Sequence, residues 1–412
     1  MKITKEEALK YHKECKPGKI EVIPSKPSKT REELSLAYTP GVAFPCLEIK
    51  ENPLKAYEYT NKSNLVAVIS NGTAVLGLGD IGAVASKPVM EGKGVLFKIF
   101  ADIDVFDIEV SEKDPDKFCE VVKAISPTFG GINLEDIKAP ECFEIESRLK
   151  KEVDIPVMHD DQHGTAVVSA AALLNALDLT GKKISEVKVV INGAGAAAIA
   201  CGRLFKKLGV RYIYMCDSKG VISVNRKDLS VYKKEFAVET EKTQLKDVLK
   251  GADVFLGLSK GNILSEEMIK SMNKNPIVFA LANPVPEINP EEAFRIRKDV
   301  VIATGRSDYP NQINNVIAFP YIFRGALDTR ARDINDEMVI SAVKAISDLG
   351  KKKGSLIPSP FDRDLFLYVS KAVAEAAVRS GSARIKGFSP KKYEETLKER
   401  LKQMENVSYR CV

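Results

Sequence analysis

The segment HDDQHGTA, residues 159–166, concentrates side chains that bind metal ions or transfer protons. Two of the chain's three histidines lie in it, His159 and His163, with two aspartates and a glutamine between them. Histidines at this spacing on one helix face can supply two of the nitrogen ligands that zinc prefers. No cysteine lies close by in the sequence, and Gly164 directly follows the second histidine, ahead of an apolar helical pattern. We therefore expect hydrogen-bonding neighbours of the carboxylates, with a zinc site as the alternative.

Carboxylates that follow apolar stretches form a second chemical pattern. Glu135 and Asp136 come after the apolar start of INLEDIKAP, and Asp160 and Asp161 come after IPVMH. Ligands gather at the carboxyl ends of strands in α/β sheets, so carboxylates from two such segments can meet. Together they would make an oxygen-rich cage of the kind that Mg²⁺ and Mn²⁺ select. The alternative is helix capping, by LEDI for one helix and by Asp161 for the next.

Two glycine-rich loops match GxGxxG/A: GLGDIG at 77–82 and GAGAAA at 193–198. Only the second has the full context of a dinucleotide site, with an apolar strand pattern before it and a helical pattern over about 196–208 after it. Its small residues would allow a tight turn at Gly193, approach of a pyrophosphate at Gly195 and close helix packing at Ala198. The phosphates would meet backbone N–H groups at Ala194, Gly195, Ala196 and Ala197. The alternative is a plain βα turn.

The next strand pattern ends in Asp217, 24 residues after Gly193. A carboxylate at this position bonds the ribose hydroxyls and repels a 2′-phosphate, which favours NAD over NADP. Lys219 is close enough in sequence to balance that charge, so the choice between NAD and NADP stays open. After the first loop, 77–82, Pro88 disfavours one continuous helix. We expect the glycines of that loop to let the chain crowd an active site, or else to form a turn in the core.

These residues need a parallel sheet to bring them together, and the sequence predicts one. Short apolar stretches rich in β-branched residues alternate with helical patterns, at 64–70, 103–110, 187–193, 212–217, 252–258, 276–282 and 300–305. Helices are predicted at 30–37, 140–153 and 164–179, and capping residues and glycines bound two more near the C-terminal end. The predicted fold class is α/β. A smaller α/β domain over 1–160 precedes a Rossmann-type doubly wound parallel sheet domain over 161–412, whose final helices begin at about 326.

The composition limits the classes of partner that the chain is expected to bind. The 62 basic and 56 acidic side chains are spread along 412 residues and give a net charge of +6, which suits anionic metabolites better than nucleic acid. No stretch approaches the roughly 20 apolar residues that cross a bilayer, and the charged start MKITKEEALKYHKEC is no signal peptide. We expect a cytoplasmic protein without nucleic-acid or membrane partners. Seven scattered cysteines without a CxxC pair indicate buried or inert thiols in a reducing compartment.

A series of motifs in a fixed order is more specific than any one of them. The series is AYTPGVA (37–43), GLGDIG, VMEGKGVLFK (89–98), NLEDI (133–137), HDDQHGTA, GAGAAA, ALANP (280–284) and QINNVIAFPYIFRGAL (312–327). Over about residues 10–390 the chain resembles the malic enzymes of the short bacterial or archaeal type. The resemblance implies a homodimer that oxidises and decarboxylates malate to pyruvate and CO₂, with NAD or NADP and with Mg²⁺ or Mn²⁺.

The resemblance assigns an acid and a base. It implies that Tyr38 of the YTP motif is the general acid and Lys93 the general base, with Asp160 as the partner of Lys93. Oxidation at C2 of malate needs a base on the hydroxyl, and a lysine can serve near neutral pH when burial and a nearby cation lower its pKa. The enol left after decarboxylation needs a proton at C3, which a tyrosine can donate. Without the motif order, Tyr38 would be interpreted as a core tyrosine and Lys93 as a surface lysine.

The resemblance also implies ligands. A divalent ion, which stabilises the enolate as a Lewis acid, would be bound by Glu135, Asp136 and Asp161. Substrate would be bound by Lys93, Asn283 and Asn314, with Asn315 as the alternative to Asn314. Larger malic enzymes carry an arginine just before the LGLGD run, whereas this chain has NGTAVLGLGD. Lys87, Lys98 or Arg306 would have to hold the substrate carboxylate in its place.

Two other functions fit parts of the pattern. The first is a metal-dependent 2-hydroxy-acid dehydrogenase that does not decarboxylate, and CO₂ release would distinguish it. The second is a non-catalytic nucleotide-binding scaffold. The presence of Tyr38, Lys93 and the three predicted metal ligands argues against the scaffold.

Overall fold

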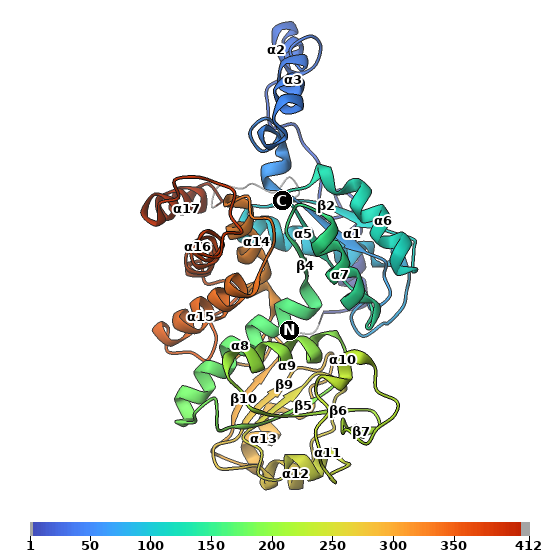
Figure 1. The fold of residues 1–412 in the computed structure, drawn as a ribbon, viewed down its shortest axis with the longest axis vertical. Helices are drawn as coiled ribbons and strands as arrows, with labels where there is room; N and C mark the ends of the chain where they lie inside the picture. The colour runs from blue at the N-terminus through green and yellow to red at the C-terminus, as the bar shows by residue number, and fades with distance from the viewer. Residues whose placement is uncertain (1–2, 405–412) are drawn as a thin grey trace.

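The computed structural model describes residues 3–404 and contains two sheets joined by a long helix (Figure 1). The first sheet has four strands in the order β2 (Asp104–Glu109), β1 (Leu65–Ser70), β3 (Gly131–Leu134) and β4 (Val157–His159). All of its strand pairs are parallel, so the four carboxyl ends lie on the same side of the sheet. The strands predicted at 64–70 and 103–110 are confirmed as β1 and β2.

The second sheet has six strands in the order β10 (Val301–Thr304), β9 (Ile277–Ala280), β8 (Val254–Gly257), β5 (Lys188–Asn192), β6 (Tyr212–Asp217) and β7 (Gly220–Val221). Its pairs are parallel except that of β6 with β7. The chain builds outward from β5 through β6 and then returns to place β8 on the other side of β5. This reversal between β5 and β8 is the switch point of a dinucleotide-binding sheet, and it confirms the predicted Rossmann-type α/β fold.

Helices cover both faces of the second sheet. Successive residues of each strand point to opposite faces, so each strand contributes side chains to two cores. Val189 and Ile191 of β5 belong to a core that includes α8 and α9, whereas Val190 faces a second core with α11, α12 and α13. The helices of this region are α8 (Asp160–Thr180), α9 (Ala196–Leu208), α10 (Val231–Lys234), α11 (Leu245–Leu249), α12 (Glu266–Ser271) and α13 (Pro290–Ile296).

Helix α8 connects the two sheets. It follows β4 directly, runs for 21 residues and is buried along most of its length between α9 and α15. The helix predicted at 164–179 is confirmed, but it begins earlier, so Asp160, Asp161 and His163 lie in its first turn rather than ahead of it. The domain boundary predicted at residue 160 coincides with the start of α8 and stays a prediction.

The last four helices stack beside the first sheet (Figure 1). They are α14 (Phe319–Asp328), α15 (Asp336–Lys352), α16 (Asp364–Arg379) and α17 (Pro390–Met404). Phe319 of α14 packs edge to face on Phe97, with ring centroids 4.8 Å apart. The buried Arg324 donates to Asn64 Oδ1, just before β1, over 2.6 Å. Helix α14 therefore packs against the first sheet and its helix α5, although the predicted domain division groups α14 with the second sheet.

The N-terminal helices include an arm that projects from the body. They are α1 (Lys5–Lys13), α2 (Arg31–Ala37), α3 (Ala43–Glu51), α4 (Ala56–Tyr59), α5 (Ala83–Ala101), α6 (Pro115–Ile125) and α7 (Glu141–Glu152). Helices α2 and α3 form the arm at the top of Figure 1, and Thr30 caps α2 as predicted. The expectation that Pro88 interrupts a helix is wrong, because α5 continues through it. Pro88 lies in the second turn of α5, where it removes one backbone hydrogen bond. The burial of Met90 and Phe97 stabilises the helix despite this loss.

The cysteine prediction is confirmed in part. Cys119, Cys142, Cys201 and Cys216 are buried free thiols, and burial raises the pKa of Cys201 to about 12. Cys46 is an exposed free thiol, so its inertness stays a prediction, and the prediction is wrong at Cys15, which is disulfide-bonded. Cys411 lies outside the described residues. Between residues 3 and 404, the structure contains no helix that is both long and apolar enough to cross a membrane.

Candidate active site

Three carboxylates lie together at the carboxyl ends of β3 and β4. Glu135 and Asp136 follow β3, and Asp161 lies in the first turn of α8, after β4. One oxygen of each lies within 4.8 Å of the others. The turn after β3 sets their spacing, because Asp136 has a φ of +52° and its N–H donates to Asp161 Oδ2 over 2.8 Å. With Asp160, which precedes Asp161, we call these residues the acidic cluster.

The acidic cluster is short of positive charge. Burial and then repulsion by Asp161 raise the pKa of Asp136 to about 8. Burial also raises the pKa of Glu135 well above its usual range, more than the nearby Lys93 lowers it. Asp136 Oδ2 is buried and has no hydrogen-bond partner among the described residues. A hard divalent cation would satisfy this oxygen and offset the repulsion, so these residues fit Mg²⁺ or Mn²⁺.

Lys93 of α5 reaches into the acidic cluster. Its Nζ lies 2.8 Å from Asp160 Oδ2 and 2.9 Å from Glu135 Oε1, and its side chain is 12% exposed. The predicted contact with Asp160 is therefore present. Nζ also lies 4.5 Å from the centroid of the Phe319 ring. Burial alone would lower the pKa of Lys93, but Asp160 and Glu135 outweigh burial and raise it, which is the reverse of the direction expected from the sequence.

The two histidines flank the acidic cluster without joining it. His163 Nε2 lies 2.7 Å from Glu146 Oε1, on α7. His159 is completely buried at the end of β4, with Nε2 3.5 Å from Asp161 Oδ2, and burial lowers its pKa. Within residues 3–404, the group that can hold a metal ion consists of the three carboxylates Glu135, Asp136 and Asp161. The structure thus brings the predicted ligands together and gives the zinc alternative no support.

The predicted substrate asparagines follow the last strands of the second sheet. Asn283 comes after β9, and a β-carbon on Gly305, after β10, would lie 3.1 Å from Asn283 Nδ2. Asn314 accepts a hydrogen bond from the Val316 N–H over 3.0 Å and so caps a short 3₁₀ helix. Asn315 Nδ2 donates to Asp160 Oδ2 over 3.3 Å. Of the two alternatives, Asn315 is the one that contacts the acidic cluster.

The first glycine loop, 77–82, lies between β1 and α5 and reaches one of these asparagines. A β-carbon on Gly77 would lie 3.8 Å from the carbonyl oxygen of Asn283. The loop therefore crosses from the first sheet to the second, as expected for glycines that let the chain crowd a site. Of the three candidates for the substrate clamp, Arg306 lies nearest to this contact, because it donates to the Pro284 carbonyl over 3.1 Å. Lys98 is paired with carboxylates at the start of β2, and Lys87 with carboxylates within β2.

Tyr38 is not brought to Lys93 by the structure. Tyr38 ends α2, on the arm that projects from the body in Figure 1, and it is 70% exposed. Leu36 and Phe44 of the same arm are more than 70% exposed. The single chain therefore presents an apolar arm to solvent and leaves Lys93 without the predicted acid.

The second glycine loop has the geometry of a dinucleotide turn. Gly193 has a φ of +134°, and a β-carbon there would lie 2.7 Å from the Leu258 carbonyl oxygen. Gly195 is the N-cap of α9 without a side chain to occupy the first N–H groups of the helix. Ala198 is 1% exposed and packs closely, as predicted. The N–H groups at the start of α9 are thus open to a phosphate.

Asp217 ends β6 as predicted, but its charge is balanced. Arg226 donates to both carboxylate oxygens, over 2.7 and 3.0 Å, and Lys233 donates over 2.7 Å. These hydrogen bonds outweigh burial and lower the pKa of Asp217 to about 2. The expectation that Lys219 balances the charge is wrong, because its Nζ pairs with Asp228. Sequence reasoning missed Arg226 and Lys233, for which the basic residues of NRKDLSVYKK were the available signal.

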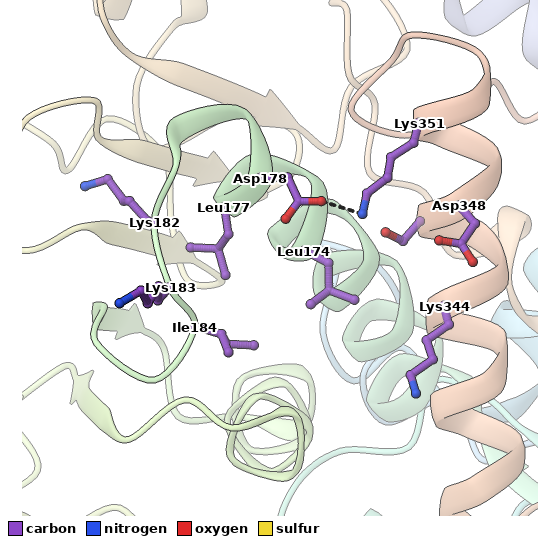
Figure 2. Close-up of a pocket in the computed structure, with 10 residues that line it drawn as sticks. Leu174, Leu177, Asp178, Lys182, Lys183, Ile184, Lys344, Asp348 and Lys351 are labelled. Carbon is purple, nitrogen blue, oxygen red and sulfur yellow. Dashed lines mark ion pairs between the residues drawn. The ribbon is translucent and has the colours of Figure 1, made fainter.

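A cavity of about 470 Å³ lies away from all of these residues, between the end of α8 and α15. Figure 2 shows Lys344 and Lys351 on α15 and Lys182 and Lys183 beyond the end of α8, with Asp178 paired to Lys351. None of the residues that line it is a predicted site residue. Asp178 is 17 residues further along α8 than Asp161, or roughly 25 Å at the rise of a helix. The cavity is therefore no part of the candidate active site.

Known proteins resemble the chain over nearly its whole length. Residues 17–150 match the family described as Malic enzyme, N-terminal domain, and residues 162–378 match Malic enzyme, NAD binding domain. The NADP-dependent malic enzyme of Escherichia coli (strain K12) is 57% identical over 401 residues, which cover 92% of this chain and 53% of that protein. The bifunctional malic/malolactic enzyme of Bacillus subtilis (strain 168) is 55% identical over 92% of this chain and 95% of that protein.

The fold matches a solved structure equally closely. The crystal structure of malic enzyme from Pyrococcus horikoshii Ot3 superposes with a TM-score of 0.92 at 47% identity, over 98% of this chain and 96% of that one. The chain spans about half the length of the Escherichia coli relative and nearly all of the other two. The shared architecture therefore comprises both sheets and the helices that follow them.

Proposed function

The chain belongs to the malic enzyme family, and on that premise we propose that it oxidises (S)-malate and releases CO₂ to give pyruvate, with NAD or NADP as the oxidant. The observation that carries the proposal is Lys93 held between Asp160 and Glu135, beside carboxylates that fit a divalent cation. Burying such charges costs free energy, and perturbed buried groups of this kind gather at functional sites. A scaffold that only bound nucleotide would gain nothing from them. The roles of individual residues stay predictions.

In the proposed reaction, Lys93 accepts the proton of the C2 hydroxyl while the C2 hydrogen leaves as hydride. Glu135, Asp136 and Asp161 would hold a divalent cation, which would act as a Lewis acid and stabilise the negative charge left after decarboxylation. Because Lys93 contacts Glu135, a cation held by Glu135 would lower the pKa of Lys93 toward the range of a base. Asn283 and Asn315 hold substrate from the side of the second sheet, with Arg306 as the clamp.

We place Tyr38 of one chain in the active site of a second chain, within a homodimer. The acid must protonate C3 of the enol beside Lys93, yet the arm carries Tyr38 away from the Lys93 of its own chain. A symmetric exchange of arms would cover the exposed Leu36 and Phe44 and complete both sites at once.

Mixing two variants that are each impaired in pyruvate release tests this arrangement. Lys93→Ala and Tyr38→Phe chains, unfolded and refolded together, should regain about a quarter of the wild-type rate of pyruvate release. Half of randomly assorted dimers are mixed, and each mixed dimer carries one intact site. If both residues act within one chain, mixing restores nothing, and the arrangement is wrong.

We further propose that the chain accepts NADP as well as NAD. Repulsion of a 2′-phosphate by Asp217 was the argument for NAD, and Arg226 and Lys233 offset that repulsion. Their donor groups are also of the kind that binds phosphate oxygens. The name of the Escherichia coli relative, an NADP-dependent malic enzyme, agrees with this proposal.

The direct test supplies malate, Mn²⁺ and either NAD or NADP to the purified protein. Pyruvate, CO₂ and reduced cofactor are measured in parallel, and we expect them in equal amounts. Reduced cofactor without CO₂ would indicate the dehydrogenase that does not decarboxylate. No turnover with either cofactor would indicate the scaffold. The cytoplasmic location and the lack of a nucleic-acid partner stay predictions.

A further inference from the structure

Glu287 is a completely buried carboxylate that lies beyond the carboxyl ends of β8 and β9. Among residues 3–404 it has no ion pair, and its partners are backbone groups. Its Oε2 accepts a hydrogen bond from the Ala282 N–H over 3.0 Å, and its Oε1 accepts one from the Ser259 N–H over 3.4 Å. Burial raises the pKa of Glu287 despite these bonds. Since a buried unpaired charge is costly, its presence needs a reason.

The two N–H groups belong to two different loops. Ser259 follows β8, and Ala282 immediately precedes Asn283 in the loop after β9. The Glu287 carbonyl also accepts hydrogen bonds from Ile263 and Leu264, over 3.0 and 3.1 Å, which closes the loop after β8 around it. A side chain on Gly257, the last residue of β8, would collide with the Glu287 carboxylate. The glycine therefore makes room for the charge.

The loop after β8 rests on the dinucleotide turn. Asn192, the last residue of β5, donates from Nδ2 to Ser259 Oγ over 2.6 Å. The Leu258 carbonyl oxygen lies so close to Gly193 that a β-carbon there would be 2.7 Å away. Glu287 thus lies behind the turn predicted to bind the cofactor and behind the loop that carries the asparagine predicted to bind substrate.

We propose that Glu287 is a positioning residue that fixes the loop after β8 against the loop after β9, and so sets the cofactor turn relative to Asn283. This inference rests on the proposed function, because the role of Asn283 does. A carboxylate can accept from two N–H groups at once, whereas a glutamine offers one oxygen and turns its NH₂ toward the second N–H. The geometry therefore requires the charged side chain, even though its burial is unfavourable.

Asp253 provides a matched control at the other end of β8. It is also a buried carboxylate, 8% exposed, and it accepts the Lys188 N–H over 2.9 Å. Unlike Glu287 it has a cationic partner, Lys182, at 2.5 Å. It precedes the strand, at the amino end of the sheet, and so touches neither of the two loops.

The experiment compares Glu287→Gln with Asp253→Asn in the full chain. The measurements are KM and kcat with malate, the Kd of NADH and NADPH by fluorescence titration without malate, and the thermal midpoint. For Glu287→Gln we expect KM for malate and Kd for the nucleotide to rise about tenfold, as for a lost hydrogen bond to a charged group. Its midpoint should stay at or above that of the wild type, because a desolvated charge is gone. Asp253→Asn should lower the midpoint and leave both constants unchanged.

Glu287→Asp adds a second variant that keeps the charge but withdraws it by one methylene, and it should raise the same two constants. Glu287→Gln with unchanged KM and Kd, or with a lowered midpoint as its sole effect, would overturn the proposal. If the wild type does not turn over malate, the proposed function fails. The nucleotide Kd of the two Glu287 variants then still decides this inference by itself.

Discussion

Carboxylate side chains lie at the carboxyl ends of both sheets, but their negative charge is balanced within the chain only at the second sheet. At the first sheet, burial raises the pKa of Asp136 to about 8, and that of Glu135 is raised as well. At the second sheet, Arg226 and Lys233 bring the pKa of Asp217 down to about 2. One site needs more positive charge than the chain supplies, and the other supplies its own. This difference agrees with the roles proposed above, a cation and proton transfer at the first sheet and cofactor selection at the second.

The largest expected effect comes from removing the base at the first sheet. In Lys93→Ala nothing accepts the hydroxyl proton, so hydride transfer from malate should fall by about 10²–10⁴-fold. Single-turnover reduction of NAD or NADP measures this step. Lys98→Ala is the control, because Lys98 lies on the same helix but pairs with carboxylates at the start of β2. A near-normal rate in Lys93→Ala would mean that Lys93 is not the base.

Removing one carboxylate of the acidic cluster tests whether the cluster binds a metal ion. A chelator should abolish turnover, and Mn²⁺ or Mg²⁺ should restore it. Outer-shell partners alone change metal affinity by about 10–100-fold, so Asp161→Ala should weaken Mn²⁺ binding by more than about 10²-fold in a calorimetric titration. Asp217→Asn should leave the affinity for Mn²⁺ unchanged, since its charge is balanced within the chain. Full activity in the presence of chelator would contradict the comparison.

Tyr38→Phe should have a smaller effect, because solvent can protonate the enol in place of the tyrosine. The variant should still oxidise and decarboxylate malate, but it should release pyruvate slowly. In D₂O the wild type should place deuterium at C3 with one stereochemistry, and the variant should lose that stereochemistry. Stereospecific label at the wild-type rate would show that Tyr38 is structural.

The second sheet can be tested through cofactor choice. Asp217→Ser frees Arg226 and Lys233 from their carboxylate, so the ratio of kcat/KM for NADP to that for NAD should rise by about tenfold. A charge-assisted hydrogen bond to phosphate is worth about 1.5–3 kcal/mol, which makes this a conservative figure. An unchanged ratio would mean that Asp217 does not face the ribose.

The smallest effect concerns stability in acid. An aspartate in an unfolded chain has a pKa of about 3.9, and that of Asp217 is lowered to about 2. Its ion pairs therefore stabilise the fold above about pH 4, and this contribution is lost as the pH falls toward 2. The difference in thermal midpoint between the wild type and Asp217→Asn should shrink from pH 6 to pH 3. A constant difference would mean that Arg226 and Lys233 do not hold the carboxylate in solution.

Local signals in the sequence were sufficient for most of the fold. Strands predicted at 187–193 and 212–217 agree with β5 and β6 to within a residue, because apolar runs and the glycine turn are short-range patterns. The helix predicted over about 196–208 is α9. The prediction at Pro88 was wrong because a rule about a single residue does not account for the burial of the surrounding helix. The early start of α8 was hidden by polar residues that read as a loop.

The site residues were predictable where a sequence motif contains them. They were not predictable where the fold brings distant segments of the chain together. The motif order gave the three carboxylates, Lys93 and Asp160, which the structure brings together. Arg226 reaches Asp217 through a loop whose path no local pattern fixes. The exposure of Tyr38 depends on the direction of the arm, which no local sequence pattern specifies. Glu287 belongs to none of the quoted motifs, and only its burial reveals it.

Helix α8 gives the molecule a mechanical property beyond its role as a connector. It is one uninterrupted rod of 21 residues, from the turn that holds Asp160 and Asp161 to the cavity beside α15 in Figure 2. A hydrogen-bonded helix resists compression along its axis, at a rise of about 1.5 Å per residue. The last turn and the carboxylates of the first turn therefore belong to one stiff element. The cavity residue Asp178 and the predicted metal ligand Asp161 thus belong to one element and lie roughly 25 Å apart along its axis.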